Sequence, residues 1–168
     1  MGLKRCVMLM FMFCFVLVSP CLAKEGGSKI MAEVKAVMTQ HNKAFNAQDL
    51  KGVMTLYASH PKTVLMGTGP SEVYVGDEAI GGAYNQLFTR FEANTLSFKY
   101  DWTCAGSIGD VAWFAVTTII EGTVNKEKKE RTFNMSGTLL KQKGKWRLVS
   151  MHFSRLGAEE QTAAEQPK

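Results

Sequence analysis

Two long runs of alternating apolar and polar residues near the C-terminus constrain the fold more than any other feature. The runs are Lys128–Lys141 and Lys145–Arg155, joined by a short turn that contains a glycine. Period-two alternation predicts strands whose side chains point to opposite faces of a sheet, and the glycine turn predicts a β-hairpin. Strict alternation places Trp146, His152 and Ser154 on one face of the second strand.

The preceding chain divides into shorter elements by the spacing of its apolar residues. Recurrence at three and four residues predicts helices, alternation predicts strands, and Gly or Pro marks their ends. Val111–Ile120 is almost continuously apolar, which predicts a central strand buried on both faces. Cys104 is predicted to be a small buried hydrophobic residue. The expected helices cover residues 28–47, 50–58 and 77–91, and the expected strands cover 63–67, 72–75, 95–105 and 110–124.

The N-terminus has the pattern of a secretory signal peptide. A basic start with Lys4 and Arg5 precedes the apolar run Cys6–Val18, which is short for a membrane span, and Ala23 follows at a small-residue cleavage position. We expect a signal peptide at 1–23, a domain at 24–156, a loose tail at 157–168, and a periplasmic or secreted protein. The alternatives are an uncleaved anchor and a lipoprotein modified at Cys21, and the intact mass of exported protein separates the three.

Signal removal changes both the cysteine content and the charge. Only Cys104 remains of the four cysteines, so the mature domain has no internal disulfide. Loss of Lys4 and Arg5 lowers the formal net charge from +5 to +3. A charge this small and scattered argues against nucleic-acid binding, and we expect no membrane association after cleavage.

Three motifs follow one another along the chain: AFNAQDL at 44–50 with LYA at 56–58, VGDEAI at 75–80, and GKWRLVSMHFS at 144–154. In this order they resemble the motifs of the SnoaL-like group in the nuclear-transport-factor-2-like (ketosteroid-isomerase-like) superfamily. The resemblance implies an α+β fold: about three N-terminal helices pack on a strongly bent, mainly antiparallel sheet and form a cone with one deep pocket. Relatives with this fold include isomerases, cyclases, dehydratases and non-enzymatic oligomerisation domains, so fold alone does not give the activity.

The resemblance also tests steroid-isomerase chemistry, residue by residue. Isomerases of this fold use a helix-one tyrosine, an aspartate base on the first short strand and a protonated aspartate on a long strand. These positions correspond to His41, to Leu65 or Met66, and to the segment 136–138. None of the three acid–base identities is retained, so we expect no isomerase activity.

The remaining polar candidates are two histidines and a set of pocket residues. His41 and His152 are the candidate acid–base groups, because imidazole titrates near neutral pH. Two histidines without a nearby carboxylate do not define a metal site, and we expect neither metal nor cofactor. The predicted ligand pocket consists of His41, Tyr57, Met66, Tyr84, Phe88, Trp113, Met135, His152 and Ser154.

Three classes of function remain open from the sequence. The first is an exported module that binds a small, mostly apolar ligand in the cone. The second is a SnoaL-like enzyme, of isomerase, cyclase or dehydratase type, that uses His41 or His152. The third is a homodimeric interaction domain that uses its sheet face.

Overall fold

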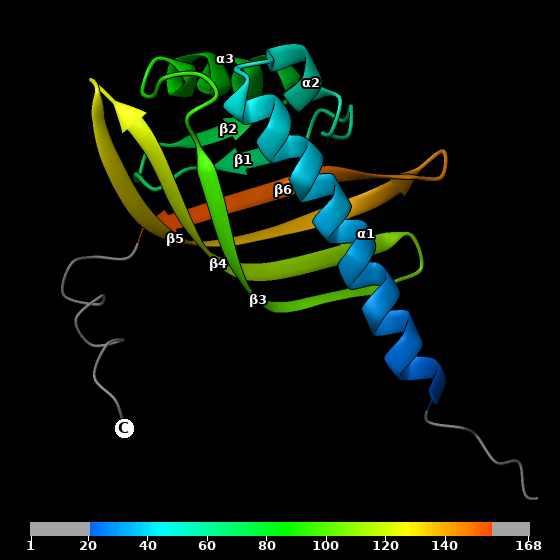
Figure 1. Ribbon diagram of the computed structural model, residues 1–168. Coiled ribbons are helices and arrows are strands. Elements are labelled where there is room, and N and C mark those ends of the chain that lie inside the picture. The colour runs from blue at the N-terminus through cyan, green and yellow to red at the C-terminus, as the bar shows by residue number, and fades with distance from the viewer. Residues whose placement is uncertain (1–20, 156–168) are drawn as a thin grey trace, which may run out of the picture.

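A computed structural model describes residues 21–155 as three helices and a six-stranded sheet (Figure 1). Most of the predicted signal peptide and all of the predicted tail lie outside these residues, so cleavage after Ala23 stays a prediction. The elements are α1 (Cys21–Asn46), α2 (Leu50–Met54), β1 (Val64–Met66), β2 (Val73–Val75), α3 (Asp77–Phe88), β3 (Ser97–Ile108), β4 (Val111–Val124), β5 (Glu127–Gln142) and β6 (Lys145–Arg155).

The sheet has the strand order β2-β1-β6-β5-β4-β3. Its neighbours are antiparallel except for β1 and β6, where Val64–Met66 run parallel to Ser150–His152. Figure 1 shows α1 crossing the concave side of the curled sheet, with α2 and α3 above it. We call this concave side the inner face and the convex side the outer face. The predicted α+β cone is therefore confirmed.

The second helix is shorter than the predicted range 50–58. Asp49 caps it by accepting a hydrogen bond from the Gly52 amide at 2.9 Å. The chain leaves the helix after Met54 because the next residues bond to the last strand instead. The Ala58 amide donates to the Leu148 carbonyl, and the Leu148 amide donates to the Leu56 carbonyl, each at 2.8 Å.

A β-bulge in β6 changes which of its residues face inward. Thr138 of β5 pairs with Ser150, but Leu139 pairs with Leu148, so Val149 is an extra residue on β6. Trp146 and Leu148 before the bulge therefore share the inner face with Met151 and Phe153 after it. The buried core includes the first three of these, and the prediction that Trp146 and His152 share a face is wrong.

A second bulge shifts the register of β3 at Thr103. Trp102 pairs with Val116 and Cys104 pairs with Ala115, which leaves Thr103 unpaired between them. Cys104 is exposed, contrary to the predicted burial. The strand β4 is also not buried on both faces, because Val111 and Trp113 on its outer face are 42% and 40% exposed.

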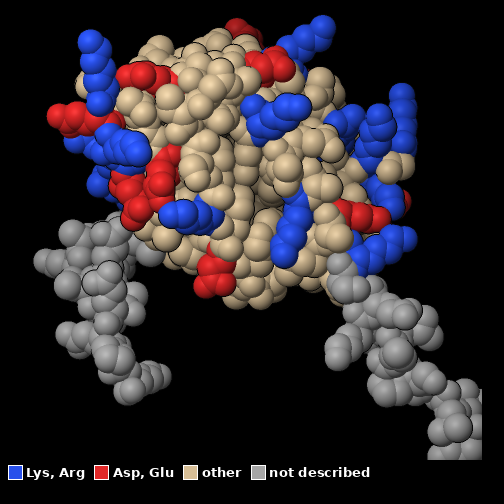
Figure 2. All heavy atoms as spheres, viewed as in Figure 1, with Lys and Arg blue, Asp and Glu red and all other residues tan. Residues whose placement is uncertain are grey.

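The visible surface carries charges of both signs. Figure 2 shows basic and acidic side chains interspersed over the side viewed in Figure 1. Within residues 21–155, no helix is both long enough and apolar enough to cross a membrane.

Candidate functional site

A cavity of about 870 Å³ lies between the inner face of the sheet, α1, α3 and the segment after α3. This volume falls within the range of small-molecule sites, which are concave and mostly apolar. Its wall is dominated by large apolar side chains, among them Met38, Phe45, Leu65, Leu87, Phe98, Ile120, Met135 and Phe153.

Three buried polar side chains form a chain of hydrogen bonds in this apolar region. Tyr84 Oη of α3 lies 2.7 Å from His41 Nε2 of α1 and 2.8 Å from Tyr57 Oη. His41 and Tyr84 line the cavity, whereas Tyr57 lies behind them, held by its bridge to Leu148. Tyr84 thus links His41 of α1 to Tyr57, whose backbone forms a bridge with Leu148 of β6.

Burial determines the protonation state of these three side chains. Loss of hydration lowers the pKa of His41 from 6.5 to about 4, so its ring is neutral at neutral pH. Burial likewise raises the pKa values of Tyr57 and Tyr84, so both hydroxyls stay protonated. Nδ1 of His41 is buried and has no hydrogen-bond partner within the described residues. A histidine in this state is a weak base.

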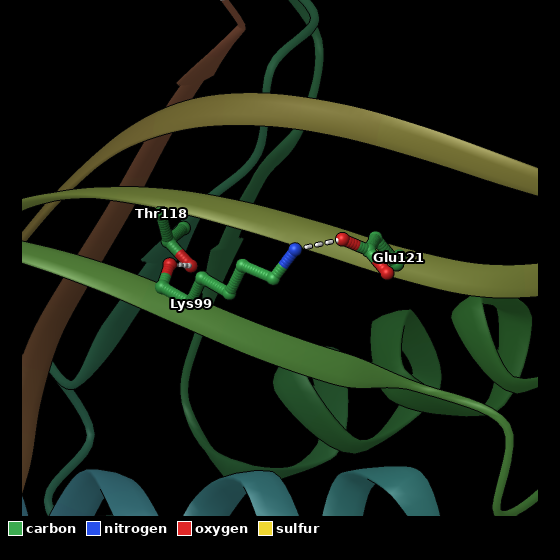
Figure 3. A network of polar contacts seen from close by, with 3 residues as sticks. All are labelled: Lys99, Thr118 and Glu121. Atoms are coloured by element: carbon green, nitrogen blue, oxygen red, sulfur yellow. Dashed lines mark hydrogen bonds and ion pairs between the residues drawn. The ribbon is translucent and has the colours of Figure 1, made fainter.

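A second polar group, formed by Asn42, Tyr100 and Thr118, also lines the cavity. The Asn42 amide nitrogen lies 2.7 Å and its oxygen 3.0 Å from Tyr100 Oη of β3. Thr118 of β4, paired with Tyr100, is buried, and its hydroxyl donates to the Lys99 carbonyl at 3.2 Å (Figure 3). The Lys99 side chain points away along the strands and pairs with Glu121. Burial raises the pKa of Tyr100, so this group is also neutral.

The two carboxylates that line the cavity both bond to backbone amides. Glu72 Oε2 accepts from the amides of Thr68 and Gly69 at 2.8 and 3.0 Å, which closes the β1–β2 turn. Glu92 Oε1 accepts from the Lys126 amide at 3.1 Å and ties the segment after α3 to the β4–β5 turn. Both carboxylates therefore have structural roles.

The structure brings together some of the predicted site residues but not others. His41, Tyr84 and Met135 line the cavity. Tyr57 contacts it only through Tyr84, and Phe88 packs against Phe45 and Tyr84 without lining it.

Four predicted pocket residues lie on the outer face instead: Met66, Trp113, His152 and Ser154. Met66 pairs with His152, and its neighbour Leu65 is the residue that lines the cavity. The bulge at Val149 turns His152 and Ser154 outward by placing Met151 and Phe153 inward. Trp113 alternates with the inward residues Ala112 and Phe114.

Sequence reasoning missed the second polar group. Asn42 follows His41 directly, and Tyr100 and Thr118 alternate correctly within their strands. The sequence feature that could have indicated this group is a polar side chain at an inward position of an otherwise apolar strand face. Thr118 on β4 is such a residue. The described residues also contain no group of three His, Cys, Asp or Glu that could hold a metal ion.

The curled sheet closed by three helices around one deep cavity defines the NTF2-like class of α+β cone proteins. The sequence profile of the SnoaL-like domain matches residues 34–158. The chain belongs to this family.

Solved structures from several bacteria share the fold. A candidate calcium/calmodulin-dependent protein kinase II association domain from Xanthomonas campestris is 23% identical, covering 75% of this chain and 87% of that chain with a TM-score of 0.66. A ketosteroid isomerase-like protein from Erwinia carotovora atroseptica is 21% identical, covering 75% and 95%, with a TM-score of 0.61. An NTF2-like superfamily protein from Salmonella enterica is 18% identical, covering 77% and 93%, with a TM-score of 0.66. Among curated proteins, none matches this sequence.

Proposed function

We propose that this domain binds a small, largely apolar molecule in its cavity and does not isomerise steroids. The observation that carries the proposal is the cavity of about 870 Å³, whose wall is mostly apolar and in which the buried His41 and Tyr100 side chains are neutral. Tyr100, Asn42 and the Tyr84–His41 pair offer hydrogen bonds that would orient such a ligand.

The arrangement favours binding over acid–base catalysis. A lowered pKa makes His41 a poor proton acceptor at neutral pH, and its Nε2 already faces Tyr84. His152, the other candidate base, lies on the outer face. At the positions that correspond to the isomerase acids, the inward residues are Leu65 and Gly137. Turnover of a β,γ-unsaturated ketosteroid by the purified protein would contradict this part of the proposal.

Filling the cavity tests ligand binding directly. Leu87 lines the cavity from α3, so Leu87→Trp should occupy part of its volume. We expect the affinity for a neutral fluorescent probe, N-phenylnaphthylamine, to fall about tenfold or more, which corresponds to about 1.4 kcal/mol. Fluorescence titration measures the affinity, and a urea unfolding curve shows whether the variant is folded.

The matched control places the same indole on the opposite side of α3. Asn85 is exposed and does not line the cavity, so Asn85→Trp should bind the probe like the wild type. Equal affinities in all three proteins, or no binding by the wild type, would overturn the proposal.

A specific observation favours homodimerisation as a second function. Met66, His152, Ser136, Ala115 and Cys104 pair in succession across five strands and form a row without Lys, Arg, Asp or Glu on the outer face. Trp113 lies beside this row and is 40% exposed. A second copy could pack against the row without bringing like charges together.

We expect the wild-type domain to sediment as a dimer and Ser136→Glu to sediment as a monomer. Ser136 is exposed at the centre of the row, so the substitution places a carboxylate in the interface without disturbing the core. Ser97→Glu, at the exposed start of the edge strand β3, is the control and should remain dimeric. A monomeric wild type at micromolar concentration would rule out this interface.

A further inference from the structure

One end of the cavity is lined by residues that follow α3 and by residues around the β4–β5 turn. Figure 1 shows the curled ends of β4 and β5 rising beside α3. The Glu92 amide donates to the Thr123 carbonyl at 2.9 Å, which holds the two sides of this end together. Five basic side chains line the cavity here, and we call them the cationic rim: Arg90, Lys126, Lys129, Arg131 and Arg155.

Strand register places part of this rim on the inner face, in line with the apolar wall. Arg155 pairs with Phe133, and Arg131 is two residues further along β5 on the same face. The two guanidinium groups therefore start from diagonal neighbours, about 7–8 Å apart. Lys129 follows after another two residues. The inner face of β5 thus changes from apolar Met135 and Phe133 to cationic at the cavity mouth.

The charges of the rim are only partly compensated within the described residues. Lys129 pairs with Glu127, but Arg90, Arg131 and Arg155 form no ion pair there. The nearby carboxylates of Glu72 and Glu92 already accept hydrogen bonds from backbone amides. Like charges at neighbouring positions of a sheet repel one another, so an anion between Arg131 and Arg155 would relieve the repulsion.

The distance from the rim to the deep wall sets the size of a matching ligand. Met135 and Arg131 are four residues apart on β5, which is about 13 Å at roughly 3.3 Å per residue. Arginine prefers carboxylate and phosphate oxygens, because its planar fork donates two parallel hydrogen bonds.

We propose that the ligand is a single-chain amphiphile with an anionic head, carboxylate or phosphate, held at Arg131 and Arg155. Its apolar chain extends inward past Phe133 and Met135. This inference rests on the proposed binding function and specifies its ligand class.

The test compares three probes with the same ten-carbon chain: decanoate, decyl phosphate and decanol. Isothermal titration calorimetry is carried out on the wild type and on the double variant Arg131→Gln/Arg155→Gln. The wild type should bind at least one of the two anions more tightly than decanol. The double variant should lose about tenfold in affinity for that anion, about 1.4 kcal/mol, and less than about twofold for decanol. The preferred anion identifies the head group.

Lys62→Gln/Lys145→Gln is the matched control, since it removes the same charge from exposed positions that do not line the cavity. It should bind every probe like the wild type. Equal binding of anions and decanol, unchanged in the rim variant, would overturn the anionic head but leave the apolar site intact. Failure of all three probes to bind the wild type would overturn both proposals.

Discussion

Replacing Trp146 by alanine is expected to lower the free energy of unfolding by about 3–5 kcal/mol. The indole is 9% exposed, and its Nε1 donates to Glu33 Oε2 of α1 at 2.6 Å. Lys141 Nζ lies 5.1 Å from the ring centroid. The substitution opens a cavity between β6 and α1 and removes a hydrogen bond and a cation–π contact. Because domains are stable by about 5–15 kcal/mol, urea unfolding should show a large shift in midpoint.

Trp113→Ala is the matched control for this prediction. Trp113 is 40% exposed on the outer face, so its removal should cost about 1 kcal/mol or less, as for most substitutions outside the core. A Trp146→Ala loss no larger than the Trp113→Ala loss would contradict the inward position of Trp146.

Acidification is expected to destabilise the domain through His41. Its pKa is about 4 in the folded protein, below the ordinary 6.5, so between these values the unfolded chain binds a proton that the folded chain does not. The stability that neutral His41 contributes is complete above pH 6.5 and is lost as the pH falls towards 4. The loss should reach about 3 kcal/mol at pH 4.

Two variants isolate this effect from the titration of other groups. His41→Leu cannot bind the proton, and Tyr84 Oη retains Tyr57 as a hydrogen-bond partner. Its stability relative to the wild type should therefore rise by about 3 kcal/mol between pH 7 and pH 4. His152→Gln is the control for replacing a histidine on the exposed outer face. Parallel stability curves for the wild type and His41→Leu would show that His41 is not buried as a neutral ring.

The sequence predicted the fold because the determinants of the fold are local or repeated. Alternation identified β5 and β6, and the recurrence of apolar residues at three and four positions identified the three helices. The three motifs that resemble the SnoaL-like group then ordered these elements into a cone. The ends of the elements differed: α1 begins at Cys21 and not at residue 28, and α2 stops at Met54 because Leu56 and Ala58 bond to Leu148.

The faces of the strands were less predictable, because one unpaired residue reverses them. The bulge at Val149 depends on how β6 aligns with β5, and no residue in the run Lys145–Arg155 marks it. His152 and Ser154 were consequently expected in the pocket but lie outside it. The bulge at Thr103 moved Cys104 to the surface in the same way.

The polar part of the site was predicted only where a residue type stood out. A histidine stands out among the apolar residues of α1, so His41 was predicted as a site residue. Tyr84 was predicted as an aromatic pocket residue. Asn42 and Tyr100 were missed because their contact joins residues 58 positions apart. Only the curl of the sheet over α1 brings such pairs together.

The parallel pairing of β1 with β6 has a consequence for the order in which the chain folds. Val64–Met66 pair with Ser150–His152, so nearly the whole domain must be synthesised before this pairing can form. Trp146, Leu148 and Met151, which fill the core beneath α1, belong to the same late strand. Contacts between distant segments form slowly, because the loop between them must close first. A nascent chain that ends before β6 would therefore leave the other core side chains without these packing partners until the last strand is synthesised.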